Sequence, residues 1–371
     1  MADSPDLDSP RPAPPATRVT ADTAAMPPFN GDEPVLADVA RAAGVSTATV
    51  SRYLNEPGKV SEKTRARVRS AIDRLNWVPN AAARSLVSRR SYTVGALLPT
   101  LAHEKFHQQL EAFQARMAVE GLSVVLACSS YDPEDGYRQV RALLARGVDA
   151  LALLGDDFPP ALFDLLRAKG IPYVITFGKH AESDHPCVGF DHARAYRMVT
   201  QRLLDLGHTR FGAIFQSTRF NSRVQARLAA IHATLAENGL ALRPHHLALM
   251  STGGPIGRIP FARESLRQIM SRDPAPTAII CGNDMLAVGA LLEAKAMGID
   301  VPGTLSLSGF DDIEIASQLQ PSLTTVLVPD RRIGELAAQY LIDRLAGRAC
   351  EHPAMLDVVL VERESTGRAS A

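Results

Sequence analysis

The sequence predicts a small all-α domain with a helix-turn-helix, followed by a two-lobe α/β domain with parallel sheets. Apolar side chains follow helical i, i+3, i+4 spacing through residues 35–75. After Tyr92, short apolar runs alternate with amphipathic helical segments, the pattern of parallel strands covered on both faces. The charge distribution separates the same two regions.

Residues 33–90 carry a net charge of +6, whereas residues 1–32 and residues 91–371 each sum to −3, so the whole chain is neutral. One basic segment in an otherwise mildly acidic chain is typical of a nucleic-acid-binding surface. On charge alone, a solvated helical face is the simpler interpretation. The choice between that face and a nucleic-acid-binding surface therefore depends on the motif in this segment.

The N-terminal segment, the lack of a long apolar run and the spacing of the cysteines indicate a cytoplasmic protein. Residues 1–32 contain seven prolines and no periodicity, which predicts a disordered tail. Acids and prolines at the N-terminus do not resemble a secretory signal, and no apolar run is long enough to span a membrane. Four separated cysteines fit a reduced, cytoplasmic protein.

The basic segment has the features of a helix-turn-helix. One helix ends at Ala43, Gly44 allows a left-handed turn, and Ser46 is placed to cap the next helix. That second helix exposes short polar residues and Arg52, which suits insertion into the major groove of DNA. Ser61 is expected to cap a third helix, which presents four basic residues to solvent or phosphate: Lys63, Arg65, Arg67 and Arg69.

The α/β region divides into two series of strands. The first series is expected at residues 93–98, 123–128, 149–154, 172–176 and 188–190. The second is expected at residues 210–215, 247–251, 277–281 and 304–309. Helices are expected at residues 106–120, 134–146, 193–206 and 225–238, and Gly207-His208 is a plausible boundary between the lobes.

Many short motifs, in order and at matching spacing, give the chain its resemblance to a known family. They include Gly44-Val45-Ser46, Thr49-Val50-Ser51-Arg52, Asn283-Asp284, Gly309-Phe310-Asp311-Asp312 and Pro321-Ser322-Leu323-Thr324-Thr325-Val326. With these motifs the sequence resembles the lactose/galactose-repressor (LacI-type) family of bacterial transcriptional regulators. The resemblance is strongest over residues 34–90 and continues through most of the remainder.

The resemblance implies a DNA-binding domain at residues 33–79 and a hinge helix with its linker at residues 80–92. The DNA contacts that it implies in the first of these are Thr47, Ala48, Thr49, Ser51, Arg52, Asn55 and Lys59. In the hinge helix it implies Ala83, Arg84 and Leu86, with Leu86 as a wedge between central base pairs. Taken alone, an apolar residue in an Ala-rich helix is more often part of a core.

The family also implies a two-lobe, periplasmic-binding-protein-like domain at residues 93–365 that binds an effector and dimerises. Its first lobe is expected at about 93–206 and 329–348, its second at about 207–328 and 349–365, with a tail at 366–371. Effector contacts are implied at Asp191, Arg227, Asn283 and Asp311, which follow predicted strands or begin helices. By itself Asp191 is better interpreted as a helix N-cap, and only the resemblance favours an effector contact.

Several positions depart from the family pattern or extend it. His192 replaces the asparagine that is usual after the aspartate, Thr100 stands where many relatives have an aspartate, and Val35 replaces a threonine cap. Arg219, Arg223 and Arg227 recur every four residues, which favours a solvated stripe, although a pocket for a carboxylate or phosphate is the alternative. Thr100, His103, Lys105, Arg219 and Arg223 are therefore further candidate effector contacts.

The predicted function is a homodimeric, nucleoid-associated regulator that binds pseudo-palindromic double-stranded operator DNA and responds to a carbohydrate or sugar acid. Repression is the common mode of the family, although the sequence does not determine the sign. A sugar-binding protein without a DNA role or an α/β enzyme are the alternatives. No dinucleotide, P-loop or nucleophile-elbow motif and no metal-ligand spacing occurs in the sequence, so we expect no cofactor, metal or catalytic site.

Overall fold

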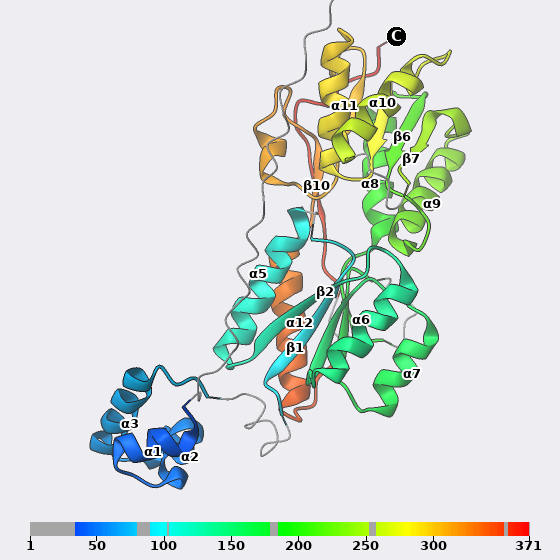
Figure 1. The fold of residues 1–371 in the computed structure, drawn as a ribbon. Helices are drawn as coiled ribbons and strands as arrows, with labels where there is room; N and C mark the ends of the chain where they lie inside the picture. The colour runs from blue at the N-terminus through cyan, green and yellow to red at the C-terminus, as the bar shows by residue number, and fades with distance from the viewer. Residues whose placement is uncertain are drawn as a thin grey trace, which may run out of the picture. The chain divides into compact units, whose positions relative to one another are not determined.

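The computed structural model describes residues 34–79, 90–101, 104–178, 185–251, 257–351 and 355–370. The chain forms two compact units, residues 1–80 and residues 81–371 (Figure 1). The predicted disordered tail at 1–32 and most of the predicted hinge segment, residues 80–89, lie outside the described residues.

The first unit is a three-helix domain. Its helices are α1 (Leu36–Ala43), α2 (Thr47–Asn55) and α3 (Glu62–Leu75), with a short 3₁₀ turn at Pro57–Lys59. Gly44 adopts φ +61°, which a glycine accommodates without strain, and the Ser46 hydroxyl accepts a hydrogen bond from the Thr49 amide. Val39, Val50, Val68 and Trp77 form the centre of a small core. The helix-turn-helix prediction is confirmed.

Two arginines of α3 support the turn through hydrogen bonds to carbonyls at the end of α1. The Arg67 guanidinium donates to the Gly44 carbonyl at 2.9 Å, and Arg74 likewise donates to the Ala42 carbonyl. At the start of α1, Val35 offers no side-chain cap, but the Asp38 carboxylate accepts from the Val35 amide at 3.0 Å. Arg67 is exposed, as predicted, and it also donates to one of the carbonyls that the end of α1 leaves without a partner.

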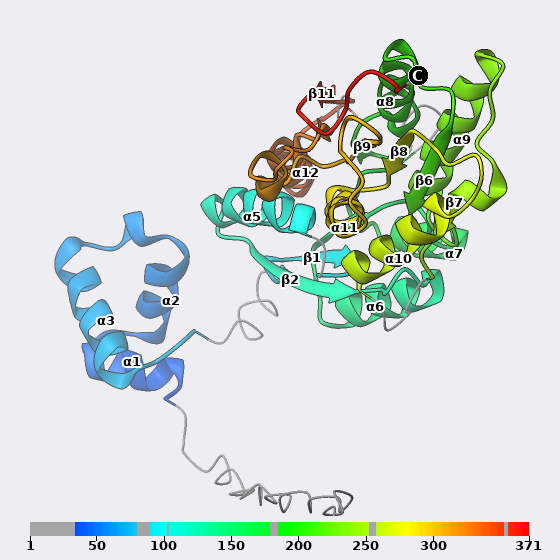
Figure 2. The same ribbon diagram turned by 90° about the horizontal axis from the view of Figure 1, so that it is seen from above.

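The first lobe of the second unit is built on a parallel sheet of strand order β2-β1-β3-β4-β5. Its strands are β1 (Thr93–Leu98), β2 (Ser123–Cys128), β3 (Ala150–Leu154), β4 (Tyr173–Thr176) and β5 (Cys187–Val188). The helices around it are α5 (Glu104–Val119), α6 (Pro133–Ala145), α7 (Pro160–Ala168) and, from far along the chain, α12 (Asp330–Leu345). Figure 2 shows α5 and α12 side by side, and they pack closely on each other.

The second lobe repeats this architecture with strand order β7-β6-β8-β9, again all parallel. Its strands are β6 (Phe211–Phe215), β7 (Leu247–Leu249), β8 (Ala278–Cys281) and β9 (Ser306–Ser308). Its helices are α8 (His192–Asp205), α9 (Ser222–Glu237), α10 (Arg258–Met270) and α11 (Asp284–Ala296). Short 3₁₀ turns lie at Pro244–His246 and Glu314–Ser317, and β10 (Thr325–Leu327) and β11 (Val359–Val361) form an antiparallel pair.

The predicted boundary between the lobes at Gly207 is wrong. Helix α8, which precedes it, packs on α9 and β8, and the Tyr196 hydroxyl donates to the Cys281 carbonyl at the end of β8. The chain therefore crosses between the lobes at residues 189–191, before α8. Sequence periodicity predicts a helix but not the sheet that it covers.

The predicted tail at 366–371 is also wrong over its described part. The Ala369 amide donates to the Leu206 carbonyl at 2.9 Å, and buried His208 lies 3.1 Å from the Gly367 carbonyl. His208 also contacts the hydroxyls of Thr277 and Ser306, so it ties the C-terminal segment to the second lobe.

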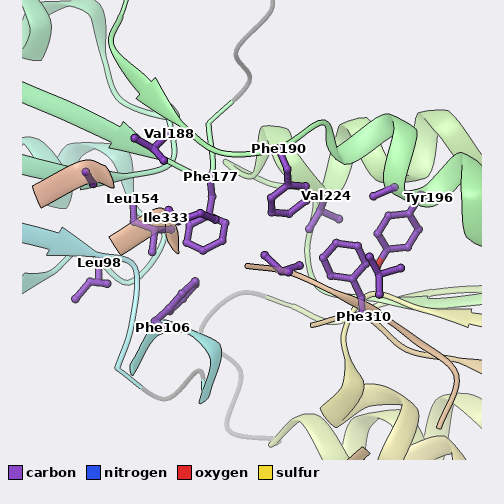
Figure 3. Packing of buried hydrophobic residues seen from close by; sticks show 14 of the residues in the cluster. Leu98, Phe106, Leu154, Phe177, Val188, Phe190, Tyr196, Val224, Phe310 and Ile333 are labelled. Atoms are coloured by element: carbon purple, nitrogen blue, oxygen red, sulfur yellow. The ribbon is translucent and has the colours of Figure 1, made fainter. Parts of the chain in front are cut away.

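A row of aromatic side chains connects the two lobes through a shared core (Figure 3). The ring centre of Phe177, which follows β4, lies 6.1 Å from that of Phe190. The ring centre of Phe190 lies 5.9 Å from that of Phe310. Phe310 in turn stacks on Tyr196 at 5.0 Å. Because of this packing, the carboxyl ends of the strands of both sheets face each other between the lobes.

Candidate ligand-binding site and nucleic-acid interface

A narrow cavity, partly open to solvent, lies at the carboxyl ends of the two sheets. The first lobe contributes Phe106, Tyr131 and Phe177 to its lining. The second lobe contributes His192, Gln216, Asn221, Arg223, Val224, Arg227, Gly282, Asn283 and Asp311. Most of these residues follow the end of a strand, where parallel α/β folds place their ligands.

Arg227, on α9, is held in place without a carboxylate. Its Nη1 donates to the Gly282 carbonyl at 3.0 Å, and its Nε donates to His192 Nδ1 at 3.2 Å. The guanidinium also lies 4.2 Å from the centre of the Phe310 ring, a cation–π contact. In the described part of the chain, the partners of the Arg227 guanidinium are a carbonyl, an imidazole and aromatic rings, and none of them is a carboxylate.

Arg223, one turn earlier on α9, is a second buried guanidinium. It is only 8% exposed, and burial lowers its pKa. Its hydrogen bond to the Asn221 Oδ1 is long, 3.4 Å. In the described part of the chain no carboxylate lies within ion-pair distance of it, and the nearby charges of Asp157 and Asp156 offset only part of the effect of burial. Gly155, at φ +82°, lies against it, and a Cβ there would stand 2.9 Å from Arg223 Nη1.

Two buried amide atoms in the lining have no hydrogen-bond partner among the described residues. They are Nδ2 of Asn283 and Oε1 of Gln216. The other end of the Asn283 side chain is used, since its Oδ1 accepts from the Leu286 amide and caps α11. A buried donor and a buried acceptor left open in one cavity indicate a polar ligand with hydroxyl groups.

Asp311 supplies the carboxylate that lines the cavity. It adopts φ +115°, a region that L-residues rarely occupy, and its amide donates to the Val326 carbonyl. Beneath it, Asp284 is buried and accepts hydrogen bonds from the Ile313 amide and the Thr325 hydroxyl. Burial, with the nearby Asp311 charge as the second cause, raises the pKa of Asp284 to about 7.

The structure brings together four of the predicted effector residues: Arg223, Arg227, Asn283 and Asp311. The other predicted residues are placed elsewhere. Asp191 is exposed and accepts from the Arg194 amide as the N-cap of α8, so for this residue the capping interpretation replaces the site assignment. Arg219 is exposed and lies over the Phe220 ring, because it precedes the first turn of α9. Thr100 is half-buried outside the lining.

The prediction for His103 and for the side chain of Lys105 concerns positions outside the described residues. Sequence reasoning missed Tyr131 and Gln216 as lining residues, and it noted His192 only as a departure from the family that could alter the pocket. Gln216 follows the predicted strand at 210–215 directly, so its position at a strand end was an available signal. Tyr131 lies three residues beyond β2, in a loop whose course only the structure shows.

The three-helix unit presents most of the predicted DNA-contacting residues on its surface. Thr47, Ala48, Arg52, Asn55 and Lys59 are exposed, whereas Thr49 and Ser51 are half-buried. Thr49 Oγ1 lies 2.9 Å from Ser46 Oγ, and Asn55 donates to the Ser51 carbonyl, so both also shape α2. Arg52 forms no ion pair within the described range. Ala83, Arg84 and Leu86 lie outside the described residues.

Comparison with known proteins supports the same division. Residues 35–80 match the family model for bacterial regulatory proteins of the lacI family, and residues 200–366 match the periplasmic binding protein-like domain. The HTH-type transcriptional regulator GntR of Escherichia coli (strain K12) is 30% identical over 329 residues, which cover 88% of this chain and 96% of that protein. The chain belongs to the lacI family of bacterial regulators.

Further relatives agree with the family assignment. The HTH-type transcriptional repressor PurR of Serratia proteamaculans (strain 568) is 32% identical over 88% of this chain and 95% of its own length. A LacI-family transcriptional regulator from Silicibacter pomeroyi has a TM-score of 0.82 at 29% identity, covering 90% of this chain and all of its own. The lac repressor dimer bound to operator and the anti-inducer ONPF has a TM-score of 0.77 at 28% identity, covering 90% and 99%.

This LacI-family chain is accordingly a DNA-binding transcriptional regulator and not an enzyme, and the predicted fold class is confirmed. None of the helices in the described ranges is both long and apolar enough to cross a membrane.

Proposed function

We propose that this regulator responds to a small sugar acid, which binds between the lobes through its carboxylate and its hydroxyls. The observation that supports this most is the pair of buried guanidinium groups, Arg223 and Arg227, neither of which is neutralised by an ion pair in the described part of the cavity. Buried charges are normally paired, because an isolated one is costly to desolvate. A ligand carboxylate would supply the missing negative charge.

The remaining polar groups suit the hydroxyls of the same ligand. Asn283 Nδ2 is an open donor and Gln216 Oε1 an open acceptor, and the Asp311 carboxylate in the same lining is an acceptor group. Phe106 and Phe177 supply the apolar surface that covers a carbon skeleton. In this proposal the ligand contacts both lobes and so changes the equilibrium between their open and closed arrangements.

A neutral sugar is the second candidate. A solved relative, described as a complex of the transcriptional regulator CelR with cellobiose, is 27% identical with a TM-score of 0.63. Asp311 and Asn283 would serve a neutral sugar equally well, whereas the two guanidinium groups favour an acid.

On DNA, we propose that the chain acts as a homodimer on a pseudo-palindromic operator, with α2 in the major groove and Arg52 reading a base pair. The dimeric lac repressor on its operator, at 28% identity, supports this arrangement. Two copies of α2 would then read two half-sites about one helical turn apart or a multiple of it.

The experiment has two stages. Genomic fragments that the full chain retains are sequenced to define the operator. Operator affinity is then titrated with D-gluconate, D-glucuronate, D-glucose and cellobiose, together with thermal unfolding in each. An acid at a hundredfold excess over its Kd should stabilise the protein by about 2.7 kcal/mol and change operator affinity. A larger response to a neutral sugar would replace the acid with the second candidate.

A further inference from the structure

His192 is buried between the ligand-facing arginine of the second lobe and the backbone of the first. Its Nδ1 lies 3.2 Å from Arg227 Nε and 3.1 Å from Arg227 Nη2, and its Nε2 lies 3.1 Å from the Phe177 carbonyl oxygen. Its ring centre lies 4.2 Å from that of Phe190, and the side chain is almost inaccessible to solvent. Both ring nitrogens therefore have defined partners.

These partners determine the protonation of the ring. An arginine nitrogen is only a donor, so Nδ1 must accept from it, whereas a carbonyl oxygen is only an acceptor, so Nε2 must carry the proton. In the imidazolium form both ring nitrogens carry a proton, so Nδ1 could not accept a hydrogen bond from Arg227. In the Nδ1–H tautomer, Nδ1 would likewise point a hydrogen at the two Arg227 donors. Only the neutral Nε2–H tautomer satisfies both contacts.

The contacts also cross the lobes. Phe177 follows β4 of the first lobe and is held at φ +58°, an uncommon conformation for a phenylalanine, while Arg227 is on α9 of the second lobe. His192, the first residue of α8, links the two just after the chain crosses between the lobes. The other titratable groups in the cavity lining are Arg223, Tyr131 and Asp311.

We propose that His192 is a positioning residue for the effector site: as the neutral Nε2–H tautomer, it orients the Arg227 guanidinium towards the cavity and ties that orientation to the first lobe. This inference rests on the proposed function only in assigning Arg227 to the ligand. A glutamine at this position offers the same pair of groups, a carbonyl oxygen for Arg227 and an amide hydrogen for Phe177, whereas a phenylalanine offers neither.

The test needs no effector. Nitrogen NMR spectra of the full chain labelled in histidine and arginine are recorded at pH 7.5 for the wild type, His192→Gln and His192→Phe. We expect the His192 signals to be those of the Nε2–H tautomer. We expect the Arg227 Nε–H to exchange slowly with water in the wild type and in His192→Gln, and at least tenfold faster in His192→Phe.

An Nδ1–H tautomer, an imidazolium spectrum, or equal Arg227 exchange in all three proteins would overturn the proposal. If His192→Phe does not fold, the wild-type tautomer and the exchange rate in His192→Gln still decide. Binding of D-gluconate is measured separately. If the wild type does not bind it, the sugar-acid proposal fails in that arm while the NMR result on His192 stands.

Discussion

The Ser222 hydroxyl donates a hydrogen bond to the Asp156 carboxylate at 2.8 Å, and this contact joins the two lobes beside the cavity. The Ser222 amide donates to Asp157 at the same distance, so two carboxylates of the loop after β3 meet the first turn of α9. Negative charge is favourable at a helix N-terminus, where amide hydrogens are open. Arg223, the next residue on α9, is thereby held over Gly155 of the same loop.

Removing the Ser222 hydroxyl should weaken this connection between the lobes. We expect Ser222→Ala to lower the free energy of unfolding of the two-lobe unit by about 1–2 kcal/mol, since a hydrogen bond to a charged group is lost. Small-angle scattering should show a larger radius of gyration if the lobes separate more often. Ser271→Ala, which removes a hydroxyl at the end of α10, is the control and should leave the scattering unchanged.

Arg223 and Arg219 allow a controlled test of whether the effector is acidic. They lie four residues apart, and only Arg223 is buried in the cavity. Arg223→Met should abolish the response to an acidic ligand. It should also stabilise the free protein by about 1–3 kcal/mol, since an unpaired buried charge is replaced by an apolar side chain of similar length. Arg219→Met should change neither property. Calorimetry with and without ligand tests both, and an unaltered acid response in Arg223→Met would remove this residue from the site.

Arg52 should determine operator preference without affecting the fold. Because it is exposed on α2 and forms no ion pair among the described residues, Arg52→Ala should leave thermal unfolding unchanged. One bidentate contact to guanine contributes about 1–3 kcal/mol of discrimination, so the preference for operator over scrambled DNA should fall by roughly ten- to a hundredfold. Arg41→Ala, an exposed arginine of α1 paired with Asp38, serves as the control. The same operator preference in Arg52→Ala as in the wild type would contradict the assignment.

Arg67 should stabilise the turn of the helix-turn-helix. Arg67→Met removes the donor to the Gly44 carbonyl and should destabilise the three-helix unit by about 0.5–1.5 kcal/mol, as expected for one hydrogen bond. Lys63→Met, at an exposed position of the same helix, should have a smaller effect. Hydrogen exchange of the α2 amides compares the two variants, and equal protection would indicate that Arg67 acts only through its charge.

Asp284 should make stability depend on pH near neutrality. Its pKa in the folded protein is raised to about 7, whereas an unfolded aspartate titrates near 4. The folded state therefore holds more protons between these values, and the stability that this carboxyl contributes falls as pH rises through that window. Asp284→Asn keeps an acceptor for the Ile313 amide and should flatten the dependence of Tm on pH between 5 and 7.5. Parallel profiles for the two proteins would show that another group is responsible.

Local features of the sequence determined the elements and their order. Gly44 and Ser46 define a turn and a cap through the conformation and hydrogen bonding of single residues, and the structure has both. The alternation of apolar runs and helical segments after Tyr92 predicted β1 to β9 within a few residues, because side-chain periodicity reflects local backbone geometry, whereas β10 and β11 were not predicted.

Which elements and side chains come together was decided only by the tertiary structure. Helix α8 covers the second sheet instead of the first, and Asp191 caps it while Arg223 and His192 enter the cavity. In the sequence, Arg219 and Arg223 are equivalent members of one spacing pattern. Their difference arises because Gly155 and Tyr131, more than sixty residues earlier, enclose only Arg223. Burial depends on contacts between segments that are distant in sequence, and a spacing pattern within one segment does not contain them.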